Sequence, residues 1–348
     1  MSFPVQFGFC LPIFAMPGAR FFRTPNYAQL DPQTTFQMGI AADALGYDSL
    51  WVADHLMLGR DEAIMEGWTT LAALAGATKQ ARLGLIHQGH FFRNPALAAK
   101  MTTTLDHISG GRFIYFIDGG YGQREHLAYG LHYPDSMEAR MEEVVDGLQL
   151  TLALWGAEKP LTHHGKFFQV NEAVNMPLPV QKPHPPIWFG EAHPSILAAC
   201  ARYGNGWNTV PVGYEEVQRR LAQLAEACVA EGRSVEELER SLETQILIAP
   251  DTAALRAKLQ GMIDLDLNAD PTSHKLPEGL DAFLAGGTDE LPASVKKAWI
   301  VGTPDEVAAQ VQSYVDLGIT HFLFWFMDAP DMAGLELFAR TVAPHFKA

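Results

Sequence analysis

Residues 82–121 read RLGLIHQGHFFRNPALAAKMTTTLDHISGGRFIYFIDGGY, and this stretch decides the fold. It contains a short apolar run at 83–86, a helical segment that opens at Asn94-Pro95, and a second apolar run at 113–117. Continuously apolar strands joined by a helix indicate parallel strands covered on both faces, because a strand with one face in water would alternate in polarity. The stretch therefore predicts a β-α-β unit.

The same alternation of apolar runs and helical patterns extends over the whole chain. Strands are predicted at 7–11, 49–52, 83–86, 113–117, 187–189, 207–210, 245–249 and 322–326. Helices are predicted at 32–45, 68–78, 95–108, 136–155, 194–203, 214–231, 304–317 and 332–342. Eight strands that alternate with helices predict an α/β fold, a single (β/α)8 TIM barrel spanning residues 1–348.

Two stretches exceed a minimal barrel. Residues 159–184 are rich in Pro, Gly and His and contain short alternating pieces, so they predict a hairpin insertion near the barrel rim. Residues 264–291 are polar and irregular, with little periodicity beyond 280–284. Because long irregular segments in a compact domain are usually functional or disordered, we expect this second insertion to cover the active site.

The composition is that of an ordinary globular protein, with 48% hydrophobic and 19% charged residues. A formal net charge of −15 argues against binding to nucleic acid or to anionic membrane surfaces, since both require clustered Lys and Arg. The first residues lack the basic region of a signal peptide, and the apolar run at 322–327 is too short to span a bilayer, which predicts a cytoplasmic protein. Three widely spaced cysteines predict buried thiols rather than disulfides or a zinc site.

Chemically capable side chains follow several of the predicted strands. Asp54-His55 follows the second strand, residues 87–90 (HQGH) the third, and residues 118–121 (DGGY) the fourth. In a barrel these strand ends converge on one mouth, where barrel enzymes bind their ligands. Histidine exchanges a proton near neutral pH, so we interpret His55 as the leading catalytic group, with Asp54 and His90 as its catalytic companions.

The same residues also fit roles without catalysis. Strand ends are loops and loops are polar, and an Asp-His dipeptide is often structural. His87 and His90 also suggest a metal site, but residues three apart on a strand point to opposite faces, and no third ligand stands at a matched spacing. We therefore predict no metal.

The glycine-rich stretches bear on the cofactor. Residues 119–122 (GGYG) are not a dinucleotide fingerprint, because no third glycine opens the following helix and no acidic residue follows about twenty residues on. A redox enzyme with this sequence must therefore receive its reducing equivalents on another carrier. Residues 190–195 precede a predicted helix, whose free N–H groups and positive end suit a phosphate.

Five sequence blocks carry a resemblance to a known family. They are GYDSLWVADH at 46–55, LDHISGGR at 105–112, PVQKPHPPIW at 179–188, ARYGNGWN at 201–208 and VGTPDEV at 301–307. In this order they resemble the bacterial luciferase-like flavin-dependent and F420-dependent oxidoreductases over nearly the whole chain. The resemblance implies a (β/α)8 barrel that binds FMN or the deazaflavin coenzyme F420 at its mouth.

The resemblance also implies which residues hold the cofactor. Its ring would lie against a bulge at Ile86-His87, often a cis non-prolyl peptide in the family, and its phosphate would lie at 190–195. The implied cofactor-binding residues are Ile86, His87, Gln88, Asp118, Gly119, Gly120, Gly190, Glu191, Ala192, His193 and Ser195. Glu191 stands where the family usually has a glycine, so close approach of a phosphate requires that its carboxylate turn outward.

The resemblance leaves the activity open. The first interpretation is a two-component monooxygenase that uses O2 and externally reduced FMN on a small organic substrate. The alternative is F420-dependent hydride transfer without oxygen. Asp54-His55 and the late insertion resemble that branch, whereas no basic cluster is visible to receive the polyanionic tail of F420. A non-catalytic flavin-binding protein is the third interpretation.

The resemblance further implies partners for the chain. Besides a small-molecule substrate, it implies a separate flavin or F420 reductase. It also implies a homodimer that pairs through the predicted helices at 68–78 and 95–108, which are rich in alanine and so permit close approach.

Overall fold

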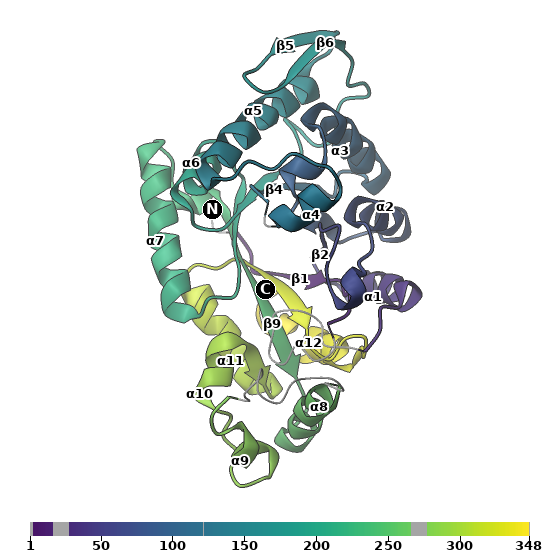
Figure 1. Cartoon of the computed structure of the whole chain (residues 1–348). Coiled ribbons are helices and arrows are strands. Elements are labelled where there is room, and N and C mark those ends of the chain that lie inside the picture. Colours follow the sequence, from purple (N-terminus) through teal and green to yellow (C-terminus); the bar gives the residue numbers. More distant parts are fainter. Residues whose placement is uncertain (1–2, 17–27, 121, 266–276, 348) are drawn as a thin grey trace.

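The computed structural model describes residues 3–16, 28–120, 122–265 and 277–347. Within these residues, eight parallel strands close into a barrel that helices surround (Figure 1). In order around the barrel the strands are β1 (Gln6–Cys10), β2 (Ser49–Ala53), β3 (Arg82–Ile86), β4 (Phe113–Ile117), β7 (Ile187–Gly190), β8 (Gly206–Thr209), β9 (Glu239–Ile248) and β11 (His321–Phe326). Pairing of β8 with β9 closes the ring, so the predicted TIM barrel is confirmed.

Helices alternate with the strands much as predicted. They are α1 (Pro32–Ala44), α2 (Gly67–Ala77), α3 (Pro95–Ser109), α5 (Met137–Gly156), α6 (Pro194–Tyr203), α7 (Tyr214–Ala230), α11 (Pro304–Asp316) and α12 (Ala333–Thr341). Their ends follow local chemistry. The Asn94 side chain accepts the Ala96 N–H at the start of α3, and Gly110 ends this helix at φ 69°.

Several elements were not predicted. Strand β9 begins at Glu239, well before the predicted start at 245, and its first half (ERSLE) is mostly polar. Apolar runs alone do not reveal the polar part of such a strand. Also unpredicted are α4 (Gln123–Ala128), α8 (Thr252–Asp264), α10 (Ala293–Ala298) and the short strand β10 (Ile300–Gly302), which pairs with β9 outside the ring.

The structure describes the first insertion in full and the second in part. The predicted hairpin is confirmed as the antiparallel pair β5 (Leu161–His164) and β6 (Gln169–Ala173), which lies beyond α5 in Figure 1. In the predicted cover, residues 266–276 lie outside the described part of the chain. The rest includes α9 (Leu280–Leu284), which packs with α8, α10 and β10 in a second hydrophobic cluster.

Large aromatic side chains fill the middle of the barrel. The rings of Trp51 and Trp188 lie 5.3 Å apart, with no room for side chains at Gly84 and Gly206, where an added Cβ would overlap them. Nearer the amino ends of the strands, buried polar groups close the interior. Because these layers are filled, a ligand can enter the barrel only from the carboxyl ends of the strands.

No helix in the described ranges is both long enough and apolar enough to cross a membrane.

Candidate active site

Strand β3 ends in a histidine that lies inside the barrel. The Ile86–His87 peptide is cis, as the resemblance implied. The His87 ring is stacked on Phe116, with the ring centroids 4.8 Å apart. Phe116 in turn contacts Trp51 in the aromatic interior. His87 therefore forms the floor of the barrel mouth.

Polar groups from β8, from β9 and from the residue after β4 surround this imidazole. Its Nε2 lies 3.2 Å from Glu243 and 3.1 Å from the Asn208 amide, and its Nδ1 lies 3.8 Å from Asp118. Burial alone would lower the pKa of His87, but the contact with Glu243 and the charges of Asp118 and Glu191 outweigh it, and the pKa is raised. The floor of the mouth is thus a buried histidine that favours its charged form.

Glu243 and Asn208 were missed by the reasoning from sequence. Glu243 lies in the polar half of β9 and accepts a hydrogen bond from Trp325 Nε1 at 2.7 Å. Asn208 accepts one from Ser241 at 2.7 Å. The available signal was a mostly polar stretch, ERSLETQ at 239–245, directly before an apolar run; polar residues at alternate positions of such a strand suit the interior of a barrel.

The glycine-rich loop after β4 lies beside His87. The Gly120 N–H donates to Asp118 Oδ1 at 2.7 Å, which holds the loop against the strand end. Burial raises the pKa of Asp118. Gly190, the last residue of β7, lies against the Asp118 carboxylate. A Cβ added at Gly190 would lie 2.9 Å from Phe116 and 3.3 Å from Asp118. The structure thus brings together Asp118, Gly120, Gly190 and His87, as expected.

His55 has a different partner from the one expected. Its Nδ1 lies 2.8 Å from Oε1 of Glu125 on α4, and Asp54 is turned elsewhere. The other oxygen of Glu125 accepts the N–H groups of Leu56 and Met57 at 2.8 and 3.3 Å. Burial raises the pKa of Glu125, but these hydrogen bonds outweigh it and the pKa is lowered. The His55 side chain is 27% exposed.

Asp54 is buried in an ion pair. Its two oxygens accept from Arg93 at 2.7 and 2.8 Å, and the Gly89 N–H donates to it at 3.0 Å. Arg93 also pairs with Glu66 at 2.8 Å and lies over the Trp68 ring. These contacts fix the loop between β3 and α3, on which His87 depends for its position.

His90 and Gln88 lie on the outer side of the barrel wall. The His90 ring contacts Phe91 and Phe168, and an added Cβ at Gly147 of α5 would meet it. Burial lowers the pKa of His90 to about 4. The Gln88 side chain is directed to Tyr115, on the face of β4 that packs against α5. The structure therefore does not bring these two side chains to His55 and His87.

Residues 190–195 form a turn into α6. The His193 Nδ1 accepts the Ser195 N–H at 3.3 Å, so His193 caps the helix. Glu191 adopts a left-handed φ of 73°, and its carboxylate pairs with Arg220 of α7 at 2.7 Å. Arg220 was not predicted from the sequence, because nothing local links α7 to this turn.

The residues at the mouth suit a polar ring. Asp118 Oδ2 and Gln245 Nε2 are buried without a hydrogen-bond partner, and Gln245 lies two residues beyond Glu243 on the same face of β9. Buried polar atoms rarely stay unpaired, so these two atoms suit a ligand that offers both a donor and an acceptor. At the start of α6, Pro194 has no N–H, the Ser195 N–H donates to His193 Nδ1, and the Ile196 and Leu197 N–H groups donate to the His193 carbonyl, so the helix-start amides that were predicted to be free for a phosphate are already paired.

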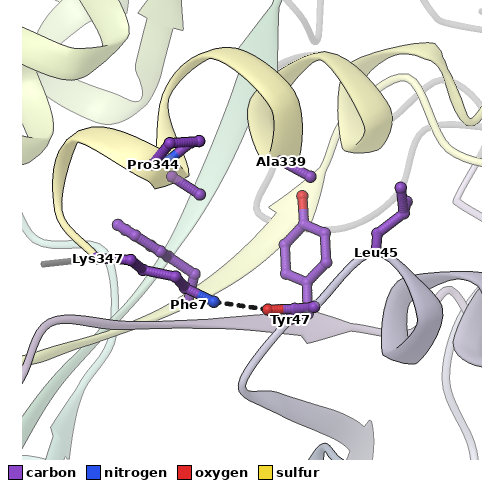
Figure 2. Close-up of a pocket in the computed structure, with 8 residues that line it drawn as sticks. Phe7, Leu45, Tyr47, Ala339, Pro344 and Lys347 are labelled. Atoms are coloured by element: carbon purple, nitrogen blue, oxygen red, sulfur yellow. Dashed lines mark hydrogen bonds between the residues drawn. The ribbon is translucent and has the colours of Figure 1, made fainter.

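A separate cavity of about 320 Å³ lies at the opposite end of the barrel (Figure 2). Phe7, Tyr47 and Pro344 line it, and Lys347 donates to the Gly46 carbonyl at 2.6 Å across it. It is remote from the carboxyl ends of the strands and holds no acid-base pair like that of His55. In the described ranges no group of three or more His, Cys, Asp or Glu could hold a metal ion.

Comparison with known proteins places these features in a family. A family model described as luciferase-like monooxygenase matches residues 13–321. An F420-dependent glucose-6-phosphate dehydrogenase of Kineococcus radiotolerans is 30% identical, over 91% of this chain and 94% of its own. A protein of the same name from Amycolatopsis mediterranei is 26% identical, over 92% of this chain and 96% of its own.

Solved structures share the fold. An F420-dependent secondary alcohol dehydrogenase in complex with an F420-acetone adduct has a TM-score of 0.74 and 21% identity, covering 99% of this chain and 100% of its own. The EDTA monooxygenase of Chelativorans sp. BNC1 has a TM-score of 0.77 and 17% identity, covering 99% of this chain and 94% of its own.

Proposed function

Because the chain belongs to the luciferase-like monooxygenase family, we propose that it is an oxidoreductase that exchanges hydride between coenzyme F420 and a hydroxyl-bearing substrate. The observation that carries this proposal is the His55–Glu125 pair at the barrel mouth, an imidazole that is oriented, accessible and able to move a proton. The names of the relatives favour F420 and suggest a sugar phosphate or a secondary alcohol as substrate.

The pair supplies acid-base chemistry. An ionised Glu125 can only accept, so Nδ1 of His55 carries the proton in this hydrogen bond, and Nε2 is left with its lone pair. Oxidation of an alcohol requires removal of the hydroxyl proton, which Nε2 can accept as the carbon gives up hydride. The resulting imidazolium is stabilised by Glu125.

The floor of the mouth positions the cofactor. When bound, F420 or FMN supplies a ring that accepts or donates hydride. We assign Ile86, His87 and Gly120 to its ring face, and the orphaned atoms of Asp118 and Gln245 to its polar edge. A separate flavin or F420 reductase remains part of the proposal, as does a role of the 264–291 insertion in covering the mouth.

The FMN-dependent monooxygenase expected first from the sequence stays a prediction. Sharing a barrel with monooxygenases supports the fold alone, and the sequence relatives named above use F420. A non-catalytic flavin-binding protein would not need an oriented His55–Glu125 pair.

Anaerobic assays with F420 test the proposal. Purified protein is mixed with F420 and either glucose 6-phosphate or 2-propanol, and the deazaflavin absorbance is followed. We expect loss of that absorbance with one of these substrate classes. Product formation that requires O2 and reduced FMN, with F420 inert, would transfer the assignment to a monooxygenase. Failure of both cofactors to bind below millimolar concentration would refute the cofactor site.

We also propose a homodimer through α2 and α3. These helices enclose an apolar groove of about 370 Å³, lined by Trp68, Ala72, Met101 and Ile108 among others. Ile108 is apolar and 52% exposed, and in a monomer this side chain would remain in contact with water. The groove supports pairing of this face with a second copy.

A further inference from the structure

His87 places an ionisable side chain against the face that the proposed function assigns to the cofactor ring. The side chain is only 6% exposed, and its imidazole is stacked on Phe116 with the ring centroids 4.8 Å apart. An apolar side chain would support a flat ring by contact alone. A histidine at this position therefore adds what an apolar residue lacks, which is charge and hydrogen bonding.

Carboxylates lie on both sides of this imidazole. Glu243 of β9 is 3.2 Å from Nε2, and Asp118 after β4 is 3.8 Å from Nδ1. Together they favour the form in which both nitrogens carry protons. Burial lowers the pKa of His87, but the hydrogen bond and charge of Glu243 and the charges of Asp118 and Glu191 outweigh it, so the pKa is raised.

The neutral form of the ring has a partner too. The Asn208 amide nitrogen lies 3.1 Å from Nε2 and can donate to this nitrogen when it carries no proton. A protonated Nε2 donates to Glu243 instead. Because Nε2 has a partner in either state, the charge of His87 can change while the fold around it stays the same.

Hydride transfer changes the charge at the mouth. In the proposed reaction, hydride leaves the carbon that bears the substrate hydroxyl, and the hydroxyl proton goes to His55. The hydride brings two electrons and one proton to the cofactor, so the ring gains one negative charge. A cation held against the ring attracts this charge, and the attraction is strong where water is excluded.

We propose that His87 acts as a cation against the cofactor ring, so that the site binds the reduced cofactor more tightly than the oxidised one. The inference rests on the proposed function, since that function places the ring over His87. His87 moves neither hydride nor proton in this role, and Glu243 is the residue that keeps it charged. Such a preference favours transfer of hydride from the substrate to the cofactor.

The test compares the dissociation constants of oxidised and reduced cofactor, measured anaerobically by absorbance or fluorescence titration with F420 or FMN. At neutral pH, His87→Gln should lower the ratio of the oxidised to the reduced constant by about tenfold. For a two-electron couple, that change lowers the midpoint potential of the bound cofactor by about 30 mV. A spectroelectrochemical titration measures the shift directly and requires no turnover.

The pH dependence identifies the charge. The wild-type preference for the reduced form should fall as the pH rises through the pKa of His87, which is raised above its usual value of 6.5, and His87→Gln should lack this step. Glu243→Gln removes the contact that favours the charged ring, so it should move the step to lower pH. His107→Gln, which replaces an exposed histidine on α3, should match the wild type at every pH.

The outcomes separate two failures. If His87→Gln weakens both cofactor forms alike, or if Glu243→Gln leaves the pH step where it was, His87 only packs against the ring and the inference is wrong, while the cofactor site stands. His87→Asn, with its melting temperature recorded, replaces His87→Gln if that variant fails to fold, and it should lower the ratio in the same direction. If the wild type binds neither cofactor below millimolar concentration, the proposed function itself fails and takes this inference with it.

Discussion

In the proposed site, His55 is held by Glu125, a residue distant in sequence, rather than by its neighbour Asp54. His55 and Asp54 are adjacent in sequence, yet their side chains serve different neighbours: His55 meets Glu125, and Asp54 meets Arg93. Successive residues at a strand end point in opposite directions, so a dipeptide does not predict a contact between its side chains. The chemistry and the loop anchor are thus separable by mutation.

Substitution of His55 and Asp54 should separate turnover from stability. General acid-base groups contribute about 10²–10⁴-fold, so His55→Ala should lower turnover by that factor with the melting temperature nearly unchanged. Asp54→Asn breaks a buried ion pair with Arg93 and should cost about 3–5 kcal/mol of unfolding free energy. Steady-state rates and thermal melts on both variants check this, and an unstable but fully active His55→Ala would end the catalytic assignment.

His90 should make the folded state sensitive to acid. Burial holds its pKa at about 4, against 6.5 in the unfolded chain, so only the unfolded state takes up a proton between these values. Stability is therefore complete above about pH 6.5 and falls as the pH drops toward 4, by about 2 kcal/mol at pH 5. Urea unfolding at pH 7.5 and pH 5 should show this loss in the wild type and a smaller one in His90→Gln.

The control for His90 is His107→Gln, which changes an exposed histidine on α3 and should keep the wild-type loss. Equal losses in the His90 and His107 variants would show that different groups cause the acid sensitivity. Turnover of His90→Gln answers a second question. The sequence-based expectation that His90 takes part in the chemistry requires a loss of about 10²-fold or more in that variant.

At the scale of elements, the sequence predicted what periodicity can reveal. Each predicted barrel strand is present, because apolar runs in a doubly covered sheet are conspicuous. The polar start of β9 and the short α4 were missed, and these supply Glu243 and Glu125 to the site. Their side chains meet His87 and His55 across distant parts of the chain, and such contacts have no local signature.

The groove between α2 and α3 should determine the oligomeric state. Ile108→Lys places a charge on this apolar face and should convert a dimer into a monomer, since a buried lysine without a partner opposes association. Val229→Lys is the matched control, because Val229 is 74% exposed on α7, away from the groove. Light scattering at micromolar concentration checks both. A wild-type monomer, or dissociation of both variants alike, would refute the interface.

At the scale of the whole molecule, the barrel separates a rigid interior from a reactive mouth. Trp51 and Trp188 fill the centre because Gly84 and Gly206 leave them room. A filled centre supports His87, which forms the floor of the mouth, and restricts ligands to one end. The sequence contained these glycines, but only the strand register shows which tryptophan each one faces.

Stability should therefore respond to a single methyl group inside the barrel. Gly84→Ala forces a Cβ into the Trp51 ring and should cost about 1–3 kcal/mol, the usual effect of overpacking. Gly261→Ala is the control, since Gly261 lies in α8 with open space around its Cα, and alanine there should add about 0.5–1 kcal/mol. Urea unfolding of both variants measures the contrast. If Gly84→Ala were as stable as the wild type, the aromatic layer would be free to move. It could then not be the rigid support for His87 that the proposed chemistry requires.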